Sequence, residues 1–524
     1  MREYTRPTRR TLLASGIGAA AMTCLIPSPG LTLQPEIARG RVAHRKWGSL
    51  EGIPGVLVSN GVEVTQTDHD GAYAIPARGG VFVIKPAHWS PPRNLLTGLP
   101  HFSYNHKPNG SPAGLRYNGS PATGPLPPSI DFILERSPER RAFNALLFAD
   151  PQPADAGEIG FVRTTMDKIA CRRDFAFGLA LGDIAGDNLG IYESYLEQTA
   201  RLGAPVWHLP GNHDHDADAA SLHHRLDTWR ATFGPPTYAF EHSDALFIML
   251  DNVQPLPGGA YEGKIGQAGL TFVRNLLSLT PQYKLLVICT HIPLTSSHSQ
   301  DPSCNTLDAD LLLQLLHGRK AVSFSGHMHT SEHHYLGSRG EQHHHQIIAA
   351  MSGSWWSGPF DGLGRPLAIA SDGTPHGWHV LSIDGDEHQT DFISTRDDAI
   401  GRVIFNETFK VERPALPLET VAGATNRFSL MVNVFDGGPR TRVFVEQDGA
   451  HLPLTRISET DPHTKQIYES AGDTLKHWVR AEPSTHLWAL EPQYQGKLDP
   501  SRARLTIIDE FSRRRVSNAL LCNA

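Results

Sequence analysis

Cysteine is scarce in this chain of 524 residues, with only five, and no pair has the C-x-x-C spacing of a thiolate zinc site or a redox dithiol. A disulfide framework is not expected, because a chain of this length can bury a core large enough to be stable without one. Dense clusters of Lys and Arg are also lacking, and the net charge is -7. We therefore expect no nucleic-acid partner.

Long apolar runs are missing as well, and we expect no stable membrane span. The nearest candidate is the mildly apolar run Leu12–Ile26, which is rich in Gly and Ala and follows the pair Arg9-Arg10. A basic region, a short apolar run and small residues in this order resemble a twin-arginine export signal. The pattern predicts an exported protein, periplasmic or extracellular. A basic, unstructured tail is the alternative interpretation of the same residues.

The length predicts two to four domains, and the sequence changes character along the chain. Residues 1–36 form the signal-type segment. Residues 37–135 carry short strand and turn signals, including Asn60-Gly61, and then an irregular connection, which predicts an N-terminal β domain plus linker. Residues 136–358 alternate apolar strands with helical patterns, which predicts an α/β layered domain. Strand and turn signals in residues 359–524 predict a C-terminal β domain.

Side chains that commonly bind metals follow the predicted strands of the α/β segment, at the point where each strand ends. Ligands of open α/β sheets bind beyond the carboxyl ends of the strands, so we expect these side chains to meet in one crevice. Imidazole, carboxylate and amide oxygen together suit Mn, Fe, Zn or similar divalent ions and not Ca. The motifs are Asp150-Pro151-Gln152, Gly182-Asp183, Gly211-Asn212-His213-Asp214, Thr290-His291 and Gly326-His327-Met328-His329.

A structural interpretation exists for each motif taken alone. A buried His near a strand end is more often a core residue than a ligand, and Asn-His-Asp after Gly is compatible with simple turn chemistry. This interpretation needs five independent coincidences in one ordered set. We therefore favour a metal centre.

The ordered set resembles the five motifs of the calcineurin-like metallophosphoesterases, over roughly residues 143 to 355. The flanking segments 55–61, 67–71 and 371–377 resemble exported bacterial members that carry additional N-terminal and C-terminal β domains. The resemblance implies an α/β fold with a four-layer core, in which two mixed sheets are flanked by helices. It also implies small N-terminal and C-terminal β-sandwich domains.

The same resemblance implies two divalent metal ions and a role for each motif. Asp183 would bridge the ions, and His213 would contact the scissile phosphate and assist the leaving group. The implied reaction is hydrolysis of a phosphomonoester, phosphodiester or pyrophosphate by a hydroxide that bridges the ions. The ligands would be Asp150, Gln152, Asp183 and His329 for the first ion, and Asp183, Asn212, His291 and His327 for the second.

Gln152 departs from the usual first motif, Asp-x-His, although a branch with Asp-Pro-Gln exists. An amide oxygen is a harder and weaker donor than an imidazole nitrogen. The substitution therefore favours Mn or Fe, with Zn or Mg as alternatives, and weaker binding of the first ion. A second interpretation places Gln152 outside the ligand set, where it would hydrogen-bond a water or the substrate.

Three further sets of residues carry open alternatives. Asp187 either orients His213 by a hydrogen bond or acts as a carboxylate at a helix N-terminus. Trp355 and Trp356 either wall the substrate pocket or pack between the core and the C-terminal domain. The runs His333-His334 and His343-His344-His345 are expected to be solvated turns.

The leading hypothesis is a metal-dependent phosphoesterase whose partner is a small phosphorylated substrate. A protein Ser/Thr phosphatase is the second enzyme hypothesis, and it is weaker because Arg-bearing motifs are absent after Gly182-Asp183 and Gly211-Asn212-His213. A non-catalytic glycan or cell-wall binding protein on this scaffold is the third. The complete ligand set argues against the third hypothesis.

Overall fold

The computed structural model describes residues 36–338, 341–396, 399–405, 418–422, 428–499 and 501–519. The predicted export signal therefore lies outside the described residues, apart from Glu36. Among the helices described, none combines the length and the apolar character that a membrane crossing requires.

Two small sheets form the N-terminal β domain, and their shared core contains Val42, Val58, Ile75 and Val83. The expected hairpin is present, because β3 pairs antiparallel with β4 across the turn that contains Asn60-Gly61. One sheet contains β2 (Ser49–Gly52), β1 (Ile37–Lys46), β5 (Ala72–Pro76) and β9 (Phe132–Ile133). The other contains β4 (Val64–Gln66), β3 (Leu57–Ser59), β6 (Gly80–Val83) and β8 (Ser103–Asn105). A separate short pair is β7 (Trp89–Ser90) with β10 (Glu135–Arg136).

The first core sheet has the order β13-β12-β11-β22-β23. Strands β11, β12 and β13 are parallel, so their carboxyl ends meet at one edge, whereas β22 and β23 run antiparallel to their neighbours. The strands are β11 (Ala142–Phe148), β12 (Phe177–Leu181), β13 (Val206–Leu209), β22 (Gly377–Asp384) and β23 (Glu387–Ser394).

The second core sheet has the order β14-β15-β18-β19-β21-β20. Strands β15, β18, β19 and β21 are parallel, and the two edge strands are antiparallel to their neighbours. The strands are β14 (Tyr238–His242), β15 (Ala245–Met249), β18 (Leu285–Cys289), β19 (Ala321–Ser325), β20 (Glu332–Leu336) and β21 (His343–Ile347).

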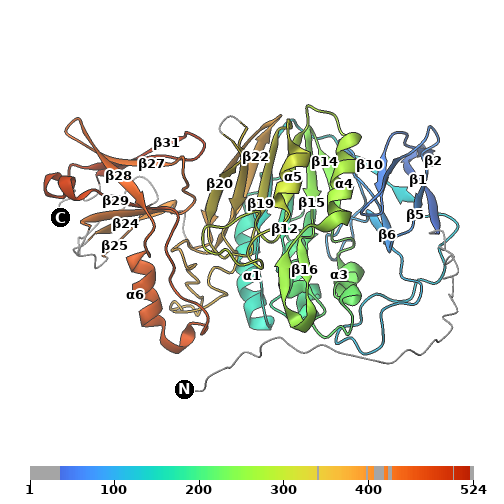
Figure 1. Ribbon diagram of the computed structural model, residues 1–524, viewed down its shortest axis with the longest axis horizontal. Helices are drawn as coiled ribbons and strands as arrows, with labels where there is room; N and C mark the ends of the chain where they lie inside the picture. Colours follow the sequence, from blue (N-terminus) through green and yellow to red (C-terminus); the bar gives the residue numbers. More distant parts are fainter. Residues whose placement is uncertain are drawn as a thin grey trace, which may run out of the picture. The chain divides into compact units, whose positions relative to one another are not determined.

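The core has the expected four layers, because side chains alternate along its strands. In β11, Leu147 belongs to the core between the two sheets. Between the same sheets, Trp207 of β13 stacks on Phe240 of β14, with 4.1 Å between ring centres. Leu146 and Phe148 instead join the cluster that contains the buried faces of the first three helices. Helices α4 and α5 cover the second sheet (Figure 1). The helices are α1 (Ala156–Ala170), α2 (Tyr192–Ala200), α3 (Asp227–Thr232), α4 (Gly266–Ser278) and α5 (Ala309–Leu316).

The core sheet extends beyond the boundary that we placed between residues 358 and 359. Strand β22 pairs with β11 along its length, and β23 pairs with β22, although the sequence placed both strands in the C-terminal β domain. Pairing of segments more than 200 residues apart is set by the tertiary fold and leaves no local signature in the sequence.

The C-terminal β domain is an eight-stranded sheet with the order β25-β24-β26-β29-β28-β27-β30-β31. Strand β28 pairs with β27 through its first half and with β29 through its second half, and both halves of the sheet contribute to one apolar core. The elements are β24 (Gly401–Phe405), β25 (Leu418–Ala422), β26 (Leu430–Val434), β27 (Arg442–Gln447), β28 (Ala450–Ile457), α6 (Pro462–Ala471), β29 (Leu487–Leu490), β30 (Arg504–Ile508) and β31 (Arg514–Ala519).

The histidine runs are not solvated turns, and that expectation was wrong. They lie in β20 and β21, where His333, His344 and His345 are buried. His333 and His344 hydrogen-bond each other at 2.9 Å, and His333 also contacts Asp436 of the C-terminal domain. Imidazoles that find hydrogen-bond partners can be buried, so a polar run does not exclude a strand.

Candidate metal centre

The predicted ligand motifs converge at one edge of the two core sheets. Asp150 follows β11, Asp183 follows β12, and Asn212 follows β13 in a short 3-10 helix (Asn212–Asp214). His291 and His327 follow β18 and β19 of the second sheet. The parallel pairing within each sheet brings these carboxyl ends together.

Asp183, His291 and His327 lie close together, since one donor atom of each lies within 4.8 Å of the others. His291 is fully buried, and its Nδ1 donates a hydrogen bond to the carbonyl oxygen of Leu181 at 2.8 Å. Its Nε2 therefore faces the cluster, 3.3 Å from Asp183 Oδ2 and 3.1 Å from Asn212 Oδ1. These are the four residues that the resemblance assigns to the second ion.

The residues assigned to the first ion form a second group around Asp150. His329 donates through Nδ1 to the carbonyl oxygen of Gly353 at 2.5 Å, and its Nε2 lies 3.8 Å from Asp150 Oδ1. The Gln152 amide donates to Asp183 Oδ2 at 2.9 Å, which links the two groups. The remaining amide oxygen, Gln152 Oε1, is buried and has no hydrogen-bond partner. A buried acceptor without a partner is unfavourable unless a ligand satisfies it.

The buried carboxylates and imidazoles of the cluster shift one another's pKa values in opposite directions. Burial raises the pKa of Asp150, and the charge of Asp183 adds to this rise. Burial also opposes the charge of Asp183, yet His291 and His213 hold the pKa of this carboxyl below its usual range. Burial lowers the pKa of His327 to about 3 and that of His329 to about 4, so both imidazoles keep a lone pair for a metal. Burial acts in the same direction on His291, but the charge of Asp183 outweighs it and raises the pKa of His291 to about 9, so a cation would have to displace that proton. The donor set therefore fits divalent cations.

The loops that carry these side chains have strained backbones. Asp150, Gln152 and Asp183 have φ values of 51°, 39° and 51°, and His327 and His329 have values of 72° and 53°. The left-handed region is unfavourable for residues with a Cβ atom, and such strain is concentrated at functional sites.

The glycines of the motifs have a steric role. A Cβ atom on Gly211 would lie 2.1 Å from Asp183 Oδ1, and one on Gly326 would lie 2.5 Å from Asp150 Oδ2. Any other residue would push a carboxylate out of the cluster. Glycine is therefore required at both positions because a carboxylate from another motif packs directly against its Cα atom.

His213 lies beside the cluster with its ring partly exposed. Its backbone N–H donates to Asp183 Oδ1 at 2.9 Å, and its Nδ1 lies 2.7 Å from Asp187 Oδ1. Burial disfavours protonation of this ring, but Asp183 and Asp187 outweigh that effect and raise the pKa of His213 to about 9. The hydrogen bond to Asp187 occupies Nδ1 and leaves Nε2 free for a substrate. Of the two interpretations of Asp187, the geometry favours the orienting one.

Comparison with protein families identifies two parts of the chain. Residues 143–331 match the profile described as calcineurin-like phosphoesterase, and residues 345–514 match the profile of the C terminal of calcineurin-like phosphoesterase. The chain belongs to the calcineurin-like phosphoesterases. It is therefore a metal-dependent hydrolase that acts on phosphate esters. No curated protein matches the chain significantly.

Two similar solved structures are a dimetal phosphatase from Danio rerio and the purple acid phosphatase PPD1 from yellow lupin (Lupinus luteus). The Danio rerio protein is 16% identical over 48% of this chain and 96% of its own, with a TM-score of 0.35. The lupin protein is 14% identical over 70% of this chain and 72% of its own, with a TM-score of 0.38.

Two further residues position the centre of this phosphoesterase, and sequence reasoning missed both roles. The buried Asp214 carboxylate accepts the backbone N–H groups of Ile184, Ala185 and Gly211, and so ties two motif loops together. Asn252 accepts the N–H groups of His291 and Ile292. Asp214 ends the Gly-Asn-His-Asp motif, and Asn252 follows the strand at Leu246–Leu250. Both residues therefore follow the carboxyl end of a core strand, which is the position at which ligands were expected.

The two tryptophans after the last motif have different surroundings. Trp356 is buried, and its Nε1 donates to the carbonyl oxygen of Pro151 at 2.8 Å. This residue packs beneath the Asp-Pro-Gln loop in the apolar cluster of the core, and not between the core and the C-terminal domain. Trp355 is partly exposed and stacks on His329, with 3.8 Å between ring centres and 15° between ring planes. Trp355 therefore borders the centre.

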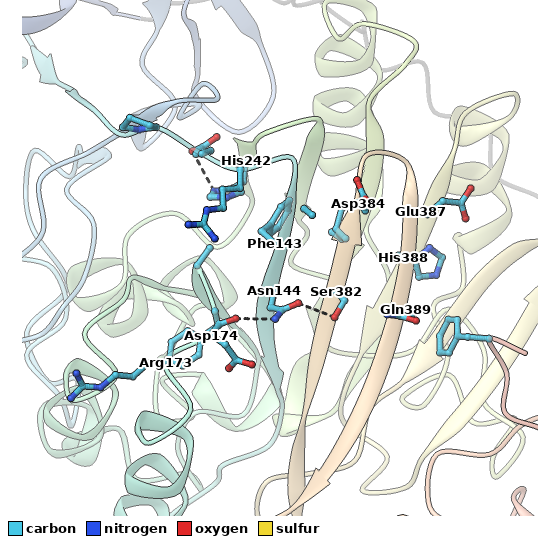
Figure 2. A pocket seen from close by; sticks show the side chains of 18 of the residues that line it. Phe143, Asn144, Arg173, Asp174, His242, Ser382, Asp384, Glu387, His388 and Gln389 are labelled. Carbon is cyan, nitrogen blue, oxygen red and sulfur yellow. Dashed lines mark hydrogen bonds and ion pairs between the residues drawn. The ribbon is translucent and has the colours of Figure 1, made fainter. Parts of the chain in front are cut away.

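A large groove lies away from these ligands, at the other end of the first core sheet. Its volume is about 1170 Å³, and its lining includes Asn144 at the start of β11 and Ser382 of β22. Figure 2 shows Asn144 between Ser382 and Asp174, to which it is hydrogen-bonded. The seven residues of β11 separate this groove from Asp150 by roughly 20 Å. The groove contains none of the predicted ligands.

Proposed function

We propose that this phosphoesterase hydrolyses small phosphate esters or anhydrides, namely phosphomonoesters, phosphodiesters or pyrophosphates, at a centre of two divalent ions. The observation that carries the proposal is the approach of donor atoms from Asp183, His291 and His327 to within 4.8 Å of one another. Gln152 bonds Asp183 through its amide nitrogen, and its buried oxygen has no partner, which supports a second ion.

The two ions, when bound, would stabilise negative charge on the phosphoryl group and activate the attacking water. The remaining steps belong to the side chains of the chain. Asp183 lies in contact with both ligand groups, through Gln152 and through His291, so one carboxylate serves both. His213 holds a proton near neutral pH, and its Nε2 can pass that proton to the leaving oxygen. Asp187 keeps the ring in the orientation that this transfer requires.

The nature of the first ligand group guides the choice of metal. Asp150 and the Gln152 amide oxygen are hard donors, and His329 is the single nitrogen donor of that group. We expect Mn or Fe to support the highest activity, with Zn and Mg less effective. The protein Ser/Thr phosphatase remains the second candidate, and the substrates below separate the two.

The test begins with protein stripped of metal and reloaded with one ion at a time. Turnover of p-nitrophenyl phosphate, its bis ester, a panel of nucleotide sugars and a phosphoserine peptide would be measured with each ion. We expect turnover of at least one small substrate and little of the peptide. Asp183→Asn is the inactive control, and we expect a loss of more than about 1000-fold, since several kcal/mol of charge stabilisation disappear. A reloaded protein that hydrolyses only the peptide would overturn the proposal.

A further inference from the structure

The aromatic ring next to the metal ligands does not stand alone. Trp355 covers one face of His329, and its own backbone is strained, with a φ of 56°. Its neighbour on the outer side is Trp478 of the C-terminal domain, with 6.2 Å between ring centres and 83° between ring planes. The rings of His329, Trp355 and Trp478 are therefore in contact one after the other, starting from the predicted first-ion ligand His329.

The segment that carries Trp478 is tied to the core by several contacts. The carbonyl oxygen of Thr474 accepts the Gly358 N–H at 3.0 Å, and the Lys476 N–H donates to Ser357 Oγ at 3.2 Å. The Lys476 ammonium lies 2.9 Å from Glu158 Oε1. Glu158 also accepts the backbone N–H of Ala154, two residues after Gln152. The C-terminal domain therefore places Trp478 at a defined position beside the metal-ligand loops.

Trp478 is 46% exposed even though it is held in this position. Its ring contacts are Trp355, His477 at 4.8 Å between ring centres, and the Lys476 ammonium at 5.9 Å. A tryptophan that is held next to a reaction centre and keeps almost half of its surface exposed can stack on the ring of a ligand.

We propose that Trp355 and Trp478 form an aromatic subsite for a planar ring in the leaving group, of the nucleobase or aryl class. This inference rests on the proposed function, because it places the phosphoryl group at the ligands next to Trp355. The two rings are nearly perpendicular, so a planar group can stack on Trp478 while its edge meets Trp355. Trp478 is thus a specificity-determining residue that the C-terminal domain supplies to the core.

The test compares Trp478→Ala with the native chain, because Trp478 contacts none of the predicted ligands. Trp47→Ala is the matched control, since Trp47 is 96% exposed and lies in the N-terminal β domain. Adenosine 5′-monophosphate and glycerol 3-phosphate serve as substrates with and without an aromatic leaving group. We expect Trp478→Ala to raise KM about tenfold for the nucleotide alone, in the range that base–aromatic stacking supplies. Bound metal and KM for glycerol 3-phosphate should not change.

Equal KM values of native and variant protein for the nucleotide would overturn the aromatic subsite, as would an equal rise for both substrates. Glucose 6-phosphate provides a third arm. If Trp478→Ala raises KM for glucose 6-phosphate as much as KM for the nucleotide, the subsite binds a hexose and not specifically an aromatic ring, and the proposal is overturned.

Binding of the phosphonate analogues of the two main substrates, in which CH2 replaces the ester oxygen, separates this inference from the proposed function. If the native chain hydrolyses neither ester, the proposed function fails, and calorimetric titration of the analogues still reports on the subsite. We expect the nucleoside phosphonate to bind more tightly than the glycerol analogue, and the difference to vanish in Trp478→Ala. Equal affinity of the native chain for both analogues would contradict the subsite.

Discussion

Gln152 is the residue at which this centre departs from its family. Its amide nitrogen donates to Asp183, and its amide oxygen is buried with no protein hydrogen-bond partner. The amide and the usual imidazole are both neutral, so the charge of the site is the same with either. The difference is donor strength, because amide oxygen is the weaker base.

The first prediction tests Gln152 as a ligand. We expect Gln152→Ala to reduce bound metal from two ions towards one per chain, since the first group then keeps only Asp150, Asp183 and His329. We expect Gln152→His to tighten the first site and improve activity with Zn, because imidazole is the softer donor. Metal analysis after dialysis against limiting free ion measures both effects. Two ions at unchanged affinity in Gln152→Ala would show that Gln152 is not a ligand.

The second prediction concerns proton transfer by His213. General acid catalysis matters most when the leaving group is a poor one, and it contributes about 100-fold or more. We expect His213→Ala to slow hydrolysis of an alkyl phosphate by about that factor and p-nitrophenyl phosphate much less. Asp187→Asn should follow the same pattern more weakly, since it keeps the shape and removes the charge near His213 Nδ1.

Asp174→Asn is the control for the exposed carboxylate, because Asp174 lies at the distant groove. Steady-state rates with a series of esters of rising leaving-group pKa provide the measurement. A uniform loss across the series would assign His213 to binding and not to proton transfer.

Between elements, a buried ion-pair cluster joins the N-terminal β domain to the core. Glu139 precedes β11 and contacts Lys85, next to β6, at 2.6 Å and His242, at the end of β14, at 3.3 Å. It also accepts the backbone N–H groups of His88 and Ser243. Burial opposes its charge, but His242 and Lys85 outweigh this and lower the pKa of Glu139 to about 2.

The third prediction follows from that lowered pKa. The folded protein binds the Glu139 proton less readily than the unfolded chain, so the Glu139 carboxylate contributes stability above about pH 4.5 and loses it as pH falls towards 2. Burial lowers the pKa of Lys85 and offsets part of this contribution. We expect Glu139→Gln to lower the free energy of unfolding at pH 7 by at most about 3 kcal/mol. The difference from the native chain should shrink below pH 4.5. Thermal unfolding at several pH values measures it, and exposed Glu135→Gln is the control.

At the scale of the whole molecule, the C-terminal part of the chain cannot be removed at Gly358 without loss of core strands. Strand β22 lies inside the first core sheet between β11 and β23, so a chain that ends at Gly358 lacks two of its five strands. The partly buried carboxylate of Asp436 further joins the C-terminal domain to His379 of β22 at 3.1 Å. Point variants such as Trp478→Ala are therefore better probes of this domain than truncation.

The fourth prediction concerns export, which we propose from Arg9-Arg10 and the apolar run that follows. Replacing both residues by Lys keeps the charge and removes the guanidinium groups. We expect the double variant, Arg9→Lys with Arg10→Lys, to remain in the cytoplasm of a bacterial host while the native chain reaches the periplasm or the medium. Cell fractionation and activity in each fraction provide the measurement. Equal export of both chains would leave the twin-arginine interpretation without support.

The sequence by itself determined the order of the motifs, the alternation of strands and helices, and the edge at which polar residues gather. These features are local, because the strand period, the positions of the glycines and the residues that follow each strand can all be recognised within short segments of sequence. Tertiary structure alone decided which distant segments meet. It pairs β22 and β23 with the core sheet and buries His333 and His344 in strands. It also brings Asn252 into contact with the His291 backbone, and Trp478 into contact with Trp355. Such contacts depend on packing between segments far apart in the chain, which no local pattern records.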